Sequence, residues 1–140
     1  MVNGRPNRHN QPVRYPCPCC GHLVFAGRPG SYDICQVCFW EDDGVQLRWP
    51  HYAGGANRPS LVESQRNFIR FGAMEERFVG NVRAASPDEP IDPGWRPIDE
   101  RDDLELWAED RAPWPDDLTV LYYWRDTYWA GSASRSVDHE

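Results

Sequence analysis

The length of 140 residues fits one domain, or one small domain with an extended tail, and is too short for several domains. A net charge of −7 lacks the basic footprint of nucleic-acid binders, and no run approaches the roughly 20 apolar residues that a membrane-spanning helix needs. We therefore expect a protein that binds neither nucleic acid nor membrane, with a core rich in its 7 Trp, 6 Tyr and 5 Phe residues.

Charge is unevenly distributed along the chain. Residues 1–60 hold 6 Arg against 4 acidic residues, whereas residues 61–140 hold 9 Arg against 18 acidic residues. The second part is therefore strongly acidic, which favours a basic protein as a binding partner. Within it, we expect Asp102, Asp103 and Glu105 to contribute to the partner-binding surface without a role in the fold.

Composition divides the chain into four parts. We expect a disordered arm over 1–13, a cysteine-rich metal-binding domain over 14–78, an acidic aromatic-rich extension packed on it over 79–131, and a tail over 132–140. Because Met1 to Gln11 contains no apolar export segment, we expect a cytoplasmic protein.

Four cysteines form two C-x2-C pairs, Cys17 with Cys20 and Cys35 with Cys38. Each pair places two thiolates on one side of a tight turn, and two such turns complete a tetrahedron that suits Zn²⁺, at about 2.3 Å per bond. The spacing predicts a closed structural zinc site with no position for substrate. Iron in a rubredoxin-like centre uses the same ligands, although Phe39 follows the second pair where rubredoxin-type loops have glycine.

Disulfides are the alternative to a metal site for these cysteines. The total of 5 is odd, and the chain shows no export signal, so reduced cysteines are favoured. Cys19 is then a spare thiol, which we interpret as packed or idle. The alternative is a redox-sensing or ligand-exchanging thiol whose pKa the nearby metal lowers.

The predicted fold is small and α+β: a zinc-ribbon or rubredoxin-like metal hairpin covered by a short helix and followed by the acidic extension. Leu23–Phe25 is the expected first strand and Tyr32–Ile34 the return strand, with a turn over residues 27–30.

Ser60 begins the clearest helix. Glu63 stands three residues later, which predicts a capping box, and Gly72 ends the helix. An apolar stripe should cover the metal hairpin, and its expected members are Leu61, Val62, Phe68, Ile69 and Phe71.

The extension has weaker signals. Residues 99–111 read as a short acidic helix with Leu104 and Trp107 facing inward. Residues 116–129 fit a helix, which we prefer, although residues 119–124 have strong strand propensity.

Several motifs of the sequence are familiar together, namely Tyr15–Gly21, Tyr32–Gly44, Gly54–Asn57, Ser60–Leu61, Asn67–Phe68 and Phe71–Ala73. Through these motifs the sequence resembles the bacterial cysteine-rich CPCC family over residues 14–75. The family pattern has Ala and Arg at the positions of Ser64 and Gln65. The resemblance implies a small metal-binding domain and brings no established activity.

The acidic run of Glu41, Asp42 and Asp43 has two interpretations. The first is a hydrogen-bonded turn whose carboxylates accept loop N–H groups and the guanidinium of Arg48 or Arg58. The second is a set of carboxylates that bind a cation or transfer protons.

Two classes of function remain. The first is a zinc-stabilised protein-interaction module, by analogy with the immunity or antitoxin partners of basic toxins. The second is an enzyme or redox protein that uses Glu41, Asp42 and His51, or the thiol of Cys19. The sequence contains no Gly-rich phosphate loop and no nucleophile elbow, which favours the first class.

Overall fold

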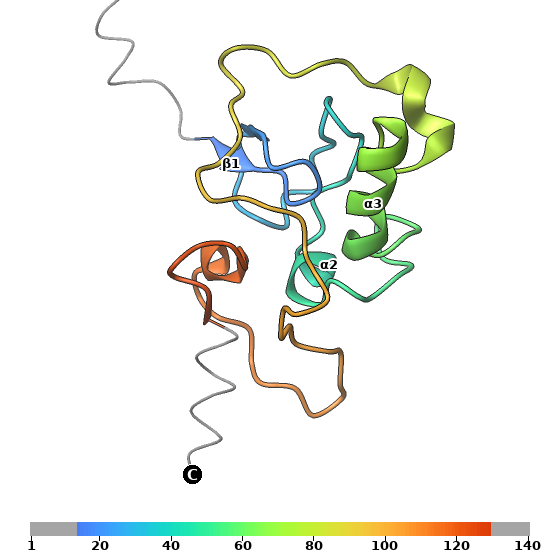
Figure 1. The fold of residues 1–140 in the computed structure, drawn as a ribbon. Coiled ribbons are helices and arrows are strands. Elements are labelled where there is room, and N and C mark those ends of the chain that lie inside the picture. Colours follow the sequence, from blue (N-terminus) through green and yellow to red (C-terminus); the bar gives the residue numbers. More distant parts are fainter. Residues whose placement is uncertain (1–13, 130–140) are drawn as a thin grey trace, which may run out of the picture.

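The computed structural model describes residues 14–129, so the predicted arm over 1–13 and the tail over 132–140 lie outside the described residues. The fold is small and α+β, with a two-stranded hairpin and short helices (Figure 1). Its elements in chain order are β1 (Tyr15–Pro16), β2 (Leu23–Phe25), α2 (Gly44–Arg48), α3 (Leu61–Phe71) and the 3-10 helices η1 (Glu76–Asn81) and η2 (Leu118–Leu121).

The hairpin joins β1 to β2 in antiparallel register, with Tyr15 opposite Phe25. The first cysteine pair lies in the connection between these strands, so the metal turn is itself the hairpin loop. The expected return strand Tyr32–Ile34 is wrong. Tyr32 adopts a left-handed conformation with φ 64°, and Ile34 forms only an isolated bridge, with Glu41.

The bounds expected for α3 are confirmed. The Ser60 hydroxyl accepts a hydrogen bond from the N–H of Glu63 at 3.1 Å, and Gly72 ends the helix with φ 88°. Local sequence therefore decides where this helix begins and ends. Only the half of the capping box in which Ser60 accepts is found among the described hydrogen bonds.

The buried face of α3 differs from the expected apolar stripe. Leu61 and Val62 are buried, but Ile69 is 69% exposed. The buried face is completed by Ser64 and Gln65, which lie three and four residues after Leu61 and so share its side of the helix. The stripe expectation was therefore wrong for Ile69, because polar side chains occupy the positions that face inward.

Residues 79–129, the described part of the extension, contain almost no regular structure. The acidic helix expected over 99–111 is absent. Of the helix expected over 116–129, residues 118–121 form the 3-10 turn η2, and otherwise residue 129 alone is helical. Aromatic side chains here bind partners far away in the sequence. The Tyr123 hydroxyl donates to the carbonyl of Arg96, and Trp124 Nε1 donates to Asp92 Oδ2 at 2.7 Å.

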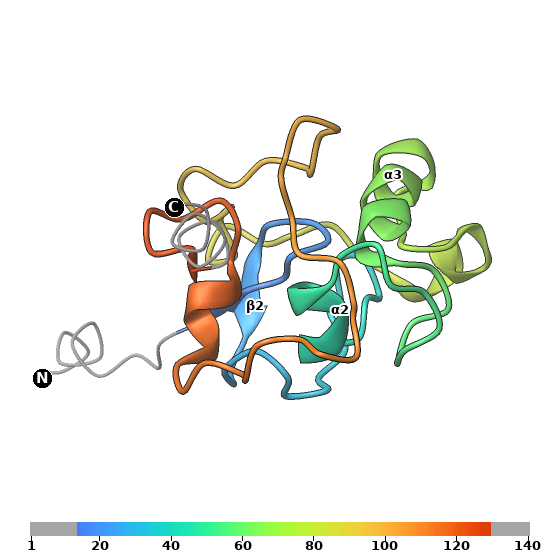
Figure 2. The same cartoon turned by 90° about the horizontal axis from the view of Figure 1, so that it is seen from below.

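The extension folds back over the hairpin, as Figure 1 shows for the segment that follows η1. The N–H of Leu23 donates to the carbonyl of Pro90 at 2.8 Å, and the N–H of Asp92 donates to the carbonyl of Gly21 at 2.8 Å. Seen from below, η2 lies beside the hairpin and near α2, against which it packs (Figure 2). The buried core surrounds the cysteines and consists of Phe25, Val37, Trp40, Leu47, Leu61, Met74, Leu121 and Tyr122.

Among residues 14–129, no helix has the length and apolar character that crossing a membrane would require.

Candidate metal centre

The two cysteine turns share one backbone arrangement. The N–H of Cys17 donates to the carbonyl of His22 at 2.9 Å, and the N–H of Cys35 donates to the carbonyl of Trp40 at 2.9 Å. In both turns the donor is the first cysteine and the acceptor lies five residues later. Each pair is therefore held in its turn by local backbone hydrogen bonds.

A second hydrogen bond closes each turn. The N–H of Gly21 donates to the carbonyl of Cys17 at 2.6 Å, and the N–H of Phe39 donates to the carbonyl of Cys35 at 2.7 Å. Both donors are left-handed, with φ 84° and 75°. Because Phe39 adopts the conformation that glycine favours, its presence does not distinguish a zinc site from a rubredoxin-like iron site.

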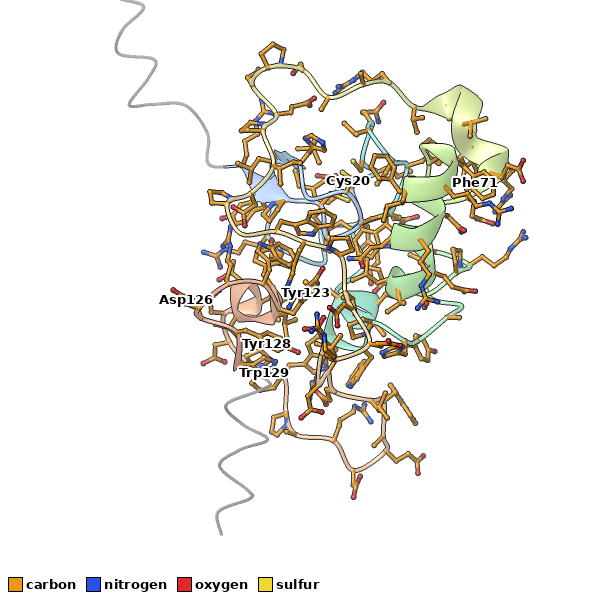
Figure 3. The ribbon with its side chains drawn as sticks, in the orientation of Figure 1. Cys20, Phe71, Tyr123, Asp126, Tyr128 and Trp129 are labelled. Atoms are coloured by element: carbon orange, nitrogen blue, oxygen red, sulfur yellow. The ribbon has the colours of Figure 1, made fainter. Side chains whose placement is uncertain are left out.

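The turns bring four thiols together inside the molecule, and Figure 3 shows Cys20 in the interior beside the hairpin. All four Sγ atoms lie within 4.8 Å of one another; Cys17 and Cys38 are 3.5 Å apart, and Cys20 and Cys35 are 3.8 Å apart. A tetrahedron with Zn–S bonds of about 2.3 Å has S···S edges of about 3.8 Å. The thiols are no more than 2% exposed and form no disulfide, so they are positioned to bind one metal ion in a closed site.

Burial and contact between the thiols shift their pKa values in opposite directions. Desolvation raises the pKa of Cys17 and Cys38 well above the ordinary thiol value. Hydrogen bonds donated by the neighbouring thiols lower the pKa of Cys35, because its thiolate is the shared acceptor. The metal-free cluster thus retains protons that a bound cation must displace.

Cys19 and His22 do not belong to the four-thiol group. Cys19 is buried, and this burial raises its pKa, an effect that a contact with Cys38 partly offsets. Redox-sensing thiols are accessible and have a low pKa, so the packed interpretation is the one that fits. The His22 ring binds the carbonyl of Glu89 through Nδ1 at 2.7 Å.

Two side chains hold the first turn from outside. Nε2 of Gln65 and Nε1 of Trp95 both donate to the carbonyl of Pro18, at 2.9 and 3.1 Å. Sequence reasoning did not find this role. The one available signal was that Gln65 occupies a position where the family pattern has Arg.

Asp43 acts as a structural cap. Its Oδ1 accepts from the N–H groups of Val45 and Gln46 at 2.8 and 3.4 Å, and its Oδ2 accepts from the N–H of Ala56 at 2.8 Å. The carboxylate thereby begins α2 and fixes the loop that follows it.

Asp42 is also directed inward. Its Oδ2 accepts from the hydroxyl of Ser31 at 2.7 Å and from the N–H of Ser31 at 3.2 Å. Burial nevertheless raises the pKa of Asp42 to about 6. The interpretation of a hydrogen-bonded turn is therefore confirmed for the loop N–H groups.

The expected guanidinium partners of this acidic run are wrong. Arg48 pairs with Glu105 at 3.0 Å, and Arg58 lies 3.9 Å from Glu75. Both arginines thus bind acids that are distant in sequence, which local spacing does not reveal.

The alternative site of Glu41, Asp42 and His51 is not assembled. Within residues 14–129, no hydrogen bond or ion pair joins any two of the three side chains, and His51 is exposed. Asp42 faces Ser31 and not an open cleft, so the geometry gives no support to acid–base chemistry here.

The chain was compared with known protein families. The family described as cysteine-rich CPCC matches residues 15–89. The chain belongs to this family. The match covers both cysteine turns, α2, α3 and η1, and it extends beyond residue 75, where the resemblance in the sequence ended. A comparison with curated proteins found no match.

Proposed function

We propose that this CPCC protein is a protein-interaction module stabilised by one structural Zn²⁺, held by Cys17, Cys20, Cys35 and Cys38 in a zinc-ribbon-like turn pair. The clustered and buried thiols support a structural role, because four sulfur ligands leave no coordination position for a substrate. The function must then lie on the surface of the molecule.

The observation that carries this proposal is an exposed aromatic surface on residues 103–116, which we name the acidic aromatic loop. Leu106, Trp107 and Trp114 are 67%, 47% and 40% exposed. Trp107 and Trp114 both contact the buried Trp49, at ring-centroid distances of 6.5 and 5.4 Å. The exposed rings therefore lie close together, and tryptophan is enriched among residues that dominate binding energy.

A buried arginine holds the acidic aromatic loop in shape. Arg48 donates from Nε and Nη2 to the two carboxylate oxygens of Glu105, each at 3.0 Å, and from Nη2 to the carbonyl of Ala112 at 2.7 Å. Its guanidinium lies 4.9 Å from the ring centroid of Trp114. A loop fixed before binding loses less entropy when a partner docks.

The charge of the acidic aromatic loop indicates the kind of partner. Asp103, Glu109 and Asp110 are exposed. The guanidinium of Arg111 lies 5.7 Å from the ring centroid of Trp49 and donates to two backbone carbonyls, so it is used within the loop. An apolar patch with an acidic rim suits a basic protein, such as the toxin partner of an immunity protein in the cytoplasm.

The test uses tagged, zinc-loaded protein and extract of the native host. We expect Trp107→Ala with Trp114→Ala to abolish capture of a defined partner, whereas Ile69→Ala, at an exposed apolar position on α3, retains it. Zinc content and melting temperature show that each variant is folded. Equal capture by both variants would contradict the proposal.

A further inference from the structure

A small cavity lies between η1, the second cysteine turn and the loop before α3, with a volume of about 90 Å³. This is several times the volume that one water molecule requires. Figure 1 shows η1 well separated from the acidic aromatic loop, so this site is distinct from the proposed partner surface. Its apolar lining includes Ile34, Phe39, Met74 and Phe78, and its charged lining includes Glu41, Arg58, Glu75 and Arg77.

Glu41 is held firmly by its backbone, but its carboxylate has no partner in the part of the chain that the structure describes. Asn57 accepts from the N–H of Glu41 at 2.9 Å and donates to the carbonyl of Glu41 at 2.9 Å. Asn57 Nδ2 also donates to Gln46 Oε1 at 3.0 Å. Within residues 14–129 no hydrogen bond or ion pair reaches the Glu41 carboxylate, whereas Asp42 and Asp43 use theirs inside the fold.

The exposure and the pairing of the charged side chains indicate whether the cavity binds a cation or an anion. The side chain of Glu75 is 14% exposed, whereas those of Arg58 and Arg77 are 72% and 54% exposed. Glu75 is thus the most buried of these three, and its carboxylate already accepts a hydrogen bond from Arg77 Nη2 at 3.1 Å, so Glu41 is the lining carboxylate without a partner among residues 14–129. Arg58 is only loosely paired with Glu75, at 3.9 Å, and can move aside for an incoming cation.

The aromatic wall already binds one cation. The guanidinium carbon of Arg77 lies 4.3 Å from the ring centroid of Phe78, and Phe39 packs on the same ring at 4.5 Å. The two rings thus give a surface for a short hydrocarbon stem and a favourable electrostatic face for its charged end.

We propose that this cavity binds a primary alkylammonium group, with Glu41 as its counter-ion and the rings of Phe39 and Phe78 against its methylene stem. Such a group is found on the lysine side chain of a protein and on free amines. A carboxylate ligand is disfavoured because Arg77 and Arg58 are already paired with Glu75, whereas the Glu41 carboxylate has no partner among residues 14–129 and would repel it.

The proposal can be tested on the full zinc-loaded chain by amide NMR titration with n-butylammonium chloride, with sodium chloride as the salt control. We expect saturable shifts at the amides of Glu41, Asn57 and Phe78. The neutral isostere n-butanol should give much smaller shifts. Glu41→Gln should weaken butylammonium binding about tenfold or more, the loss typical of a charge-assisted hydrogen bond.

Glu76→Gln is the matched control, because Glu76 is exposed on η1 and does not line the cavity. It should leave binding unchanged. Nα-acetyl-L-lysine-N-methylamide separates the two sources: binding at least as tight as that of butylammonium assigns the site to protein lysine, and weaker binding assigns it to a free amine. The proposal is overturned by an absence of saturable shifts, by equal binding of butanol, or by unchanged binding in Glu41→Gln.

Discussion

The side-chain amide of Gln65 on α3 donates to the carbonyl of Pro18, which lies inside the first cysteine turn. The same amide donates to the hydroxyl of Tyr123 at 3.0 Å and accepts from the N–H of Ile98 at 2.8 Å. One buried side chain therefore joins the metal turn, the helix and the extension.

We predict that Gln65→Leu lowers the free energy of unfolding by about 2–4 kcal/mol, because the part-buried N–H of Ile98 loses its acceptor and two further hydrogen bonds of the buried Gln65 side chain disappear. Urea unfolding of the zinc-loaded protein measures this loss. Gln36→Leu is the control, since Gln36 is exposed and, within residues 14–129, its side chain makes only a 3.4 Å hydrogen bond to the carbonyl of Ile34. Similar effects of both changes would show that Gln65 does not join these parts.

The ligand assignment predicts one Zn²⁺ per chain. Replacing Cys20 with Ser should abolish binding, unfold the region from Tyr15 to Trp40 and lower the melting temperature sharply, because the metal supplies much of the folding free energy of so small a hairpin. Cys19→Ser should retain the metal. Mass spectrometry of metal content measures both outcomes, and Cys19→Ser proving as damaging as Cys20→Ser would refute the assignment.

Asp42 predicts a specific pH dependence of stability. Burial raises the pKa of Asp42 to about 6 in the fold, whereas an unfolded Asp has a pKa of about 3.9. A raised carboxyl pKa stabilises the fold most below the unfolded value, and this contribution is lost as the pH rises through the folded value.

The stability of the native protein relative to Asp42→Asn should therefore fall by about 2 kcal/mol between pH 4 and pH 7. Comparing the two proteins at each pH cancels the effects of metal loss that they share. A difference that stays flat, or that rises with pH, would contradict the expectation.

Gly21 is a further position at which we expect a substitution to destabilise the fold. A Cβ atom there would lie 2.5 Å from the ring of Trp95, and the residue has φ 84°. Gly21→Ala should lower the free energy of unfolding by about 2–3 kcal/mol, because strain and a clash with a ring coincide. Thermal unfolding measures this loss. Gly80→Ala is the control, because nothing lies within 4 Å of the added Cβ atom there.

Two of the three acidic residues expected on the partner-binding surface are unsuitable for testing binding, because they also stabilise the fold. Asp102 accepts two hydrogen bonds from Arg96, and Glu105 accepts two from Arg48. The expectation that these two acids have no role in the fold is therefore wrong. Glu105→Arg should destabilise the fold by about 3 kcal/mol or more, because it leaves the buried charge of Arg48 without its partner.

Reversal of Asp103, Glu109 and Asp110 to Arg should leave the melting temperature nearly unchanged and slow association with a basic partner, most strongly at low salt. Association rates at two ionic strengths measure this effect. Rates that do not change would place the partner surface elsewhere.

The sequence by itself determined the features that depend on near neighbours. C-x2-C spacing closes each cysteine turn through hydrogen bonds five residues apart or fewer, and Ser60 and Gly72 set the bounds of α3 through their own backbone and hydroxyl groups. The cysteine motifs also identified the family. These features needed no knowledge of distant contacts.

Only the tertiary structure decided the form of the extension and the partners of its charges. The helical periodicity over 116–129 does not produce a continuous helix, because Tyr123 binds the carbonyl of Arg96 and Trp124 binds the carboxylate of Asp92. A continuous helix would not place these two side chains where they reach both partners. Arg48 likewise binds Glu105 across 57 residues. Buried hydrogen bonds and aromatic packing between remote segments outweigh local propensity, and no local pattern encodes them.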